Sequence, residues 1–233
     1  MAQAGAGVPI VMGVSGVRPD EVARQCRRWA AERICGFLVP PPHGVRPSQA
    51  GLIDFYARVA EAAAPHAVIV YDIPYRTGVE LELSTLHALA RIPGVRAIKD
   101  CAADAHKTQV LIAEGTWNVL AGEDHQIFTT LCQGGHGAIA ASAHLHPTLF
   151  VALYDAVQAG QWLRARELHH ALAPLVRRLF DEPNPAPLKA VLADQGWIGP
   201  DLRAPMTPAS ATAVQAAQSA HAWAERQARP NTA

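Results

Sequence analysis

Six short runs of almost entirely apolar residues alternate with longer segments of helical periodicity, and this alternation restricts the chain to few architectures. The runs are Val8–Val14, Gly36–Val39, Ala67–Tyr71, Val95–Lys99, Asn118–Ala121 and His136–Ala140. Strands that are apolar on both faces are typical of parallel sheets covered by helices. The pattern therefore predicts a parallel α/β fold.

The segments between and after these runs have the spacing of amphipathic helices. Between the runs we predict helices at Pro19–Arg33, Ser48–Ala64, Leu83–Arg91, Asp104–Glu114 and Asp124–Gln133. After the last run only helices follow, at Pro147–Ala159, Trp162–Phe180, Pro185–Gln195, and from Thr207-Pro208 to about Arg226. Asn184 is the predicted cap of the third. Arg229–Ala233 is expected to fray.

Six βα units followed by helices indicate either an incomplete (β/α)8 TIM barrel or an open sheet, since a full barrel takes about 250 residues. A Gly-x-Gly-x-x-Gly fingerprint after a strand and a Walker A sequence, which would favour an open doubly wound sheet, are both missing from the sequence. We predict a single structural domain, with a barrel portion at 1–146 and C-terminal helices at 147–228 packed on it.

Composition excludes several function classes. Half of the 233 residues are apolar, which is enough for a sizeable core, and 20 basic residues balance 20 acidic ones. This balance argues against nucleic acid as the partner. The apolar runs are too short for a membrane helix, and Met1–Gly5 lacks the cationic start of a signal peptide. Four widely spaced cysteines without a Cys-x-x-Cys pair indicate the cytoplasm.

Two predicted strands end in residues that can carry chemistry. Lys99 ends one apolar strand, and Tyr71 ends the strand before it. In a parallel barrel, neighbouring strand ends meet on the catalytic face. There a lysine of lowered pKa can form a Schiff base with a ketone, and a phenol can move protons. The alternatives are a Lys99–Asp100 salt bridge and a tyrosine at the edge of the core.

Arginine, the other lysines and the histidines can also be site residues, and one of them, Arg76, is a further candidate. Arg76 lies in the predicted loop after Tyr71 and could bind a carboxylate with two hydrogen bonds, or be an ordinary surface arginine. Lys107 and Lys189, the remaining lysines, lie in predicted helices and are expected to be surface charges. The histidines are not spaced as metal ligands, so no metal site is predicted.

The segment Tyr71-Asp72-Ile73-Pro74-Tyr75-Arg76-Thr77-Gly78, followed by Ile98-Lys99-Asp100, resembles the dihydrodipicolinate synthase / N-acetylneuraminate lyase family of class I, pyruvate-dependent aldolases. Further matches are Pro47–Leu52, Leu120–Asp124, Gly134–Ile139 and Glu182–Lys189. Together they span about residues 8 to 210. The resemblance implies a (β/α)8 TIM barrel with a C-terminal helical extension, here lacking the first two βα units of the family.

The resemblance also implies roles. Lys99 would be the Schiff-base lysine, Tyr71 the proton-relay tyrosine, Arg76 the group that binds the carboxylate of the second substrate, and Ile139 a backbone contact to bound pyruvate. The implied reaction condenses pyruvate with aspartate semialdehyde, needs no cofactor, and belongs to a cytoplasmic homo-oligomer, dimeric or tetrameric.

Two features of the family are missing here. The sequence has no Gly-Thr-Thr-Gly-Glu motif, and His43-Gly44 stand where the family has a tyrosine pair. Two other readings remain open. One is another aldolase of the family, acting on sialic acid or a keto-deoxy sugar acid. The other is an inactive, shortened family member.

Overall fold

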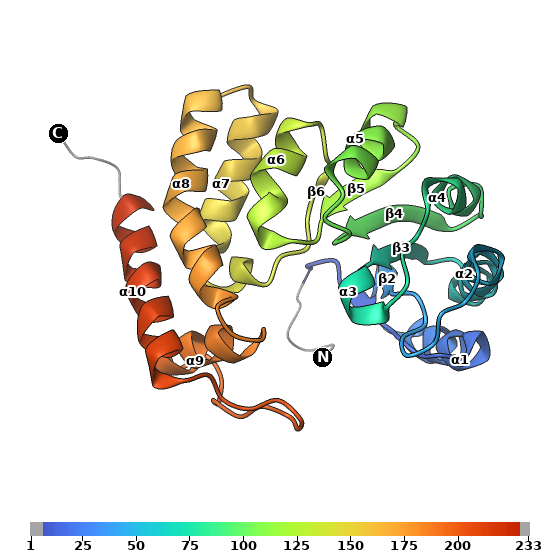
Figure 1. Ribbon diagram of the computed structural model, residues 1–233, viewed down its shortest axis with the longest axis horizontal. Coiled ribbons are helices and arrows are strands. Elements are labelled where there is room, and N and C mark those ends of the chain that lie inside the picture. Colours follow the sequence, from blue (N-terminus) through green and yellow to red (C-terminus); the bar gives the residue numbers. More distant parts are fainter. Residues whose placement is uncertain (1–6, 229–233) are drawn as a thin grey trace. The chain divides into compact units, whose positions relative to one another are not determined.

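The computed structural model describes residues 7–228 and divides into two compact units (Figure 1). The first contains the described residues through Gly122 together with Gln133–His136. The second contains Glu123–Cys132 and the chain from Gly137 onward. The expectations about a leader at Met1–Gly5 and a frayed end at Arg229–Ala233 fall outside the described residues.

A parallel sheet forms the centre of the first unit. Its strands are β1 (Val11–Gly13), β2 (Gly36–Val39), β3 (Ala67–Asp72), β4 (Val95–Asp100) and β5 (Asn118–Ala121). Each pairs in parallel with the next along the chain. The predicted parallel α/β fold is thus confirmed. Consecutive parallel order places the carboxyl ends of β3, β4 and β5 side by side at one edge.

Helices follow the strands as the periodicity predicted. They are α1 (Pro19–Trp29), α2 (Gln49–Ala63), α3 (Pro74–Thr77), α4 (Leu83–Leu89) and α5 (Ala105–Glu114). Helix α2 packs against α1, α4 and β3. Phe37 and Val70 of the strands and Leu52 and Tyr56 of α2 are fully buried in the core between them. The four-residue helix α3 was not predicted, because it is too short to show a periodicity.

The second unit is mainly helical. It contains the 3-10 turns η1 (Asp124–Gln126) and η2 (Ser142–His144), the short strand β6 (Gly137–Ala138), and the helices α6 (Ile127–Cys132), α7 (Pro147–Gln158), α8 (Trp162–Leu179), α9 (Ala186–Asp194) and α10 (Ala211–Ala228). Helix α8 packs against α7, α9 and α10. The predicted run of C-terminal helices is confirmed.

The caps of the last two helices differ from those predicted. Helix α9 begins at Ala186, and the Asn184 side chain does not cap it. At α10, Ser210 Oγ accepts a hydrogen bond of 3.2 Å from the Ala213 backbone N–H and donates one to Glu182. Ser210 therefore performs the capping that the sequence pattern had assigned to the Thr207-Pro208 pair.

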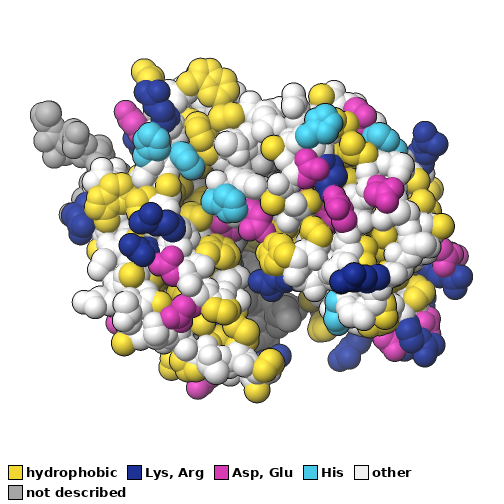
Figure 2. Space-filling model, in the orientation of Figure 1, with side chains coloured by type: hydrophobic (Ala, Val, Ile, Leu, Met, Phe, Trp, Pro, Cys, Tyr) yellow, Lys and Arg dark blue, Asp and Glu magenta, His cyan; other side chains and the backbone are white. Residues whose placement is uncertain are grey.

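Charge is mixed over the face of the molecule that Figure 2 shows. On the face shown in Figure 2, basic and acidic side chains are interspersed, and no continuous basic area is seen on that face. This distribution agrees with the balance of 20 basic and 20 acidic residues. Within residues 7–228, none of the helices has the length and apolar character needed to cross a membrane.

Candidate active site

Tyr71 and Lys99 are direct neighbours in the sheet. They are paired across β3 and β4, with Asp72 opposite Asp100 at the next position. Lys99 Nζ lies 4.2 Å from the centre of the Tyr71 ring. Both side chains are half-buried. The structure therefore brings together the amine and the phenol that the sequence had placed at neighbouring strand ends.

The environment of Tyr71 keeps its phenol protonated. Burial is the main cause that raises the pKa of Tyr71 well above its usual value, and Cys101 raises it further through an electrostatic interaction and a side-chain hydrogen bond. The positive charge of Arg76 acts in the opposite direction and lowers the Tyr71 pKa. Because the raising effects win, the phenol is neutral near pH 7 and can donate a hydrogen bond to a group beside Lys99.

Arg76 lies on the short helix α3 and not in a loop as predicted. Its side chain is exposed, and its guanidinium carbon lies 5.8 Å from the centre of the Tyr75 ring. Thr77 Oγ1 donates a hydrogen bond of 3.1 Å to the Ile73 carbonyl, and Gly78 ends the helix with a φ of +75°. These features fix the turn, so Arg76 is held close to the end of β3.

The opposite face of the same strand ends carries a buried ion pair. Lys107 Nζ on α5 lies 3.1 Å from Asp72 Oδ2 and also donates to the Leu81 carbonyl at 3.1 Å. The side chains of Lys107 and Asp72 are 4% and 0% exposed. The prediction that Lys107 is a surface charge is therefore wrong. Lys189, by contrast, is half-buried and donates to the Asp201 carbonyl.

Asp100 holds the end of β4 in a similar way. Its carboxylate accepts hydrogen bonds from Thr108 Oγ1 at 2.5 Å and from the Ala102 backbone N–H at 2.9 Å. Neighbouring residues of a strand point to opposite faces, so Lys99 and Asp100 lie on opposite faces of β4. Asp72 and Asp100 therefore anchor α5 behind the strand ends that carry Tyr71 and Lys99.

Asp72 gives the stability of the protein a characteristic pH dependence. Burial raises the pKa of this carboxyl to about 6 from 3.8, although Lys107 acts to lower it. The folded state thus binds the Asp72 proton more tightly than the unfolded state does. The stabilisation of the folded state by this proton is present below pH 3.8 and is lost as the pH rises through 6. The loss amounts to about 3 kcal/mol.

The measurement is urea unfolding of the wild type and of Asp72→Asn across pH 4 to 7. Because asparagine does not titrate, we expect the unfolding free energy of the variant, relative to wild type, to increase between about pH 4 and pH 6. A relative stability that does not change with pH would mean that Asp72 titrates as an ordinary exposed carboxyl.

The second unit contains the remaining predicted site residue. Ile139 directly follows β6 and is half-buried. The loop after it is held by Asp124, whose carboxylate accepts hydrogen bonds from the backbone N–H groups of Ser142 at 2.6 Å and Ala141 at 3.3 Å. The sequence had matched Asp124 to a strand end of the family but had not assigned it a role. The backbone contact of Ile139 to pyruvate stays a prediction.

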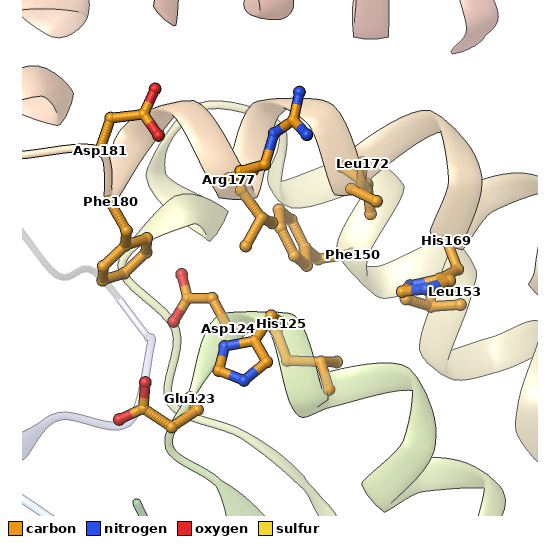
Figure 3. Close-up of a pocket in the computed structure, with 13 residues that line it drawn as sticks. Glu123, Asp124, His125, Phe150, Leu153, His169, Leu172, Arg177, Phe180 and Asp181 are labelled. Atoms are coloured by element: carbon orange, nitrogen blue, oxygen red, sulfur yellow. The ribbon is translucent and has the colours of Figure 1, made fainter. Parts of the chain in front are cut away.

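A cleft of about 500 Å³ lies within the second unit, between η1, α7 and α8. Figure 3 shows Arg177 and Asp181 on one wall and Glu123, Asp124 and His125 opposite. Apolar side chains of α7 and α8 line the rest. The cleft thus combines apolar walls with charges of both signs. Among residues 7–228, no group of three or more histidine, cysteine or acidic side chains is placed to hold a metal ion.

Comparison with known proteins gives a consistent result. Residues 1–222 match the Dihydrodipicolinate synthetase family. The 4-hydroxy-tetrahydrodipicolinate synthase 2 of Clostridium acetobutylicum is 32% identical over 206 residues, which are 87% of this chain and 72% of that protein. The dihydrodipicolinate synthase structure from Thermotoga maritima has a TM-score of 0.88 and 28% identity, covering 94% of this chain and 76% of that one.

A second similar structure is the dihydrodipicolinate synthase of Acinetobacter baumannii complexed with pyruvate. Its TM-score is 0.89 at 28% identity, covering 94% of this chain and 76% of that one. This chain thus spans about three quarters of the length of these solved relatives. The match over nearly the whole chain, together with a parallel sheet that carries Lys99 and Tyr71 at adjoining strand ends, shows that the chain belongs to the dihydrodipicolinate synthetase family.

Proposed function

We propose that the chain is a Schiff-base-forming lyase that condenses pyruvate with aspartate semialdehyde, as a 4-hydroxy-tetrahydrodipicolinate synthase does. The observation that carries the proposal is the position of the Lys99 amine, 4.2 Å from the ring centre of Tyr71 at the end of a paired strand. The names of the curated relatives support the choice of this reaction among those that a lysine amine can catalyse.

The first half of the reaction joins Lys99 to pyruvate. The neutral amine adds to the ketone carbon of pyruvate and gives a carbinolamine. The phenol of Tyr71 donates a proton to the carbinolamine hydroxyl, which leaves as water while the imine forms. A raised pKa keeps this phenol protonated before the step. The Ile139 carbonyl is the proposed backbone contact to the bound pyruvate.

The second half makes the new carbon–carbon bond. Loss of a proton from the methyl group of the bound pyruvate gives an enamine, whose carbon attacks the aldehyde. The exposed guanidinium of Arg76 binds the carboxylate of the semialdehyde through charge-assisted hydrogen bonds. The amino group of that substrate then displaces Lys99 from the imine carbon, which closes the ring and frees the enzyme.

The test is a substrate comparison. Purified protein is supplied with pyruvate and either aspartate semialdehyde, N-acetylmannosamine or glyceraldehyde, and consumption of pyruvate is followed. We expect turnover with the semialdehyde alone. A preference for a sugar aldehyde would favour the sialic-acid or keto-deoxy-sugar-acid aldolase, and no turnover with any aldehyde would favour the inactive family member.

Arg76→Ala should separate the two halves of the reaction. We expect kcat/KM for aspartate semialdehyde to fall by about 30- to 150-fold, because a charge-assisted carboxylate contact is worth about 2–3 kcal/mol. Imine formation with pyruvate should change little. Arg58→Ala is the control, since Arg58 is exposed on α2 and pairs with Asp54. Equal losses in both half-reactions would show that Arg76 supports the fold and does not select the substrate.

We also infer that the protein works in the cytoplasm as a homo-oligomer, either a dimer or a tetramer. The spacing of its cysteines and its family membership support this inference. Light scattering coupled to size-exclusion chromatography measures the oligomeric state directly. A single species with the mass of one 24.9 kDa chain would contradict it.

A further inference from the structure

Cys101 occupies a fixed position beside the candidate catalytic pair. It directly follows β4, two residues after Lys99, and its side chain is buried with 2% exposure. Its backbone N–H donates a hydrogen bond of 2.8 Å to the Asp72 carbonyl at the end of β3. The residue is therefore tied to both strands that carry Tyr71 and Lys99.

The neighbouring strand end leaves room for the sulfur. A Cβ atom at Gly122 would lie 2.3 Å from Cys101 Sγ and 2.8 Å from the Asp100 carbonyl oxygen. Neither separation is compatible with a real side chain. The Gly122 backbone N–H also donates a hydrogen bond of 2.8 Å to that same carbonyl, which ties the two strand ends together. Only glycine at position 122 allows the thiol to occupy this place.

Tyr71 is paired with Lys99, and strand alternation places Cys101 on the same face as Lys99, beside the phenol. A side-chain hydrogen bond between the thiol and the phenol is among the causes that raise the pKa of Tyr71. A thiol can donate and accept a hydrogen bond, so it can hold the phenol oxygen both before and after a proton is transferred. Tyr75 also acts on Tyr71 and raises its pKa. The cationic side chains near Tyr71 include those of Arg76 and Lys99. Neither can accept a hydrogen bond from a neutral phenol while it carries its positive charge.

We propose that Cys101 is a positioning residue, which holds the Tyr71 hydroxyl at the imine carbon through the thiol–phenol hydrogen bond. This inference rests on the proposed function. It assigns the orientation of the relay phenol to a residue of this chain. Cys101 acts through Tyr71 and does not itself touch pyruvate.

The experiment is a double-mutant cycle on the rate of imine formation with pyruvate, measured by rapid quenching with borohydride. Cys101→Ala should slow imine formation by about two- to tenfold, the usual range for one hydrogen bond. Cys101→Ser keeps a group that donates and accepts, and it should restore most of the rate. In a Tyr71→Phe background, Cys101→Ala should have no further effect on the rate.

The controls separate positioning from folding. Cys26→Ala removes a fully buried thiol from α1, away from Tyr71, and should leave the rate unchanged. If Cys101→Ala slows the reaction equally with and without the Tyr71 hydroxyl, the inference is wrong, because the thiol then acts only through packing. If the wild type forms no imine on Lys99, the proposed function itself fails. The two failures are therefore distinguishable.

Discussion

Replacement of Lys99 by arginine is expected to reduce pyruvate-dependent turnover by about 10⁴-fold or more, which is the scale seen when a covalent nucleophile is removed. Arginine keeps the positive charge but stays protonated near pH 7, so it cannot attack the ketone of pyruvate. Turnover with pyruvate and aspartate semialdehyde is the measurement, together with circular dichroism to verify that the variant is folded.

Lys189→Arg is the matched control for this loss. Lys189 is half-buried and donates to a backbone carbonyl of its own unit, a contact that arginine can also make. We expect this variant to keep the wild-type rate. A Lys99→Arg protein with more than about a hundredth of the wild-type rate would be incompatible with covalent catalysis by Lys99.

Replacement of Lys107 by methionine is expected to lower the free energy of unfolding at pH 7 by about 3–5 kcal/mol. The Asp72 carboxyl is 0% exposed and would lose its close counter-charge, so its pKa would rise further and the group would either take up a proton or remain an unpaired buried charge. Glu80, whose carboxylate lies 3.6 Å from Lys107 Nζ, is largely exposed, so the loss of Lys107 as its partner costs little stability. Urea unfolding followed by circular dichroism measures the change.

A second variant shows whether the lost charge or the lost packing is responsible. Lys107→Met combined with Asp72→Leu replaces both partners by apolar groups and should recover most of the stability, since buried ion pairs are often dispensable when both charges are removed. If the double variant is no more stable than Lys107→Met alone, the loss comes from packing and not from an unpaired carboxylate.

The order of elements could be read from the sequence because each one depends on local patterns. Strands such as Ala67–Asp72 are continuous apolar runs, and Trp162–Leu179 has a clear helical period. The meeting of Tyr71 with Lys99 was also predictable, since consecutive parallel strands end at the same edge of the sheet. The family motifs confirm what these patterns indicate.

The errors arose where a residue depends on a distant partner. Lys107 was placed on the surface because a lysine in a helix is usually exposed, and its partner Asp72 lies 35 residues earlier in the chain. The sequence pattern indicates only that Cys101 is one of four cysteines that are not paired in disulfides. Its position two residues after Lys99 was visible, but the room that Gly122 leaves for it is seen only in the structure.

Reductive trapping of pyruvate tests the central claim most directly. The wild-type protein is incubated with pyruvate and borohydride, digested, and the modified peptide is identified by mass spectrometry. The sequence has only three lysines, Lys99, Lys107 and Lys189, so the assignment is unambiguous. We predict a pyruvate adduct on Lys99 that is absent from Lys99→Arg. An adduct on Lys107 or Lys189 instead, or no adduct at saturating pyruvate, would contradict the account.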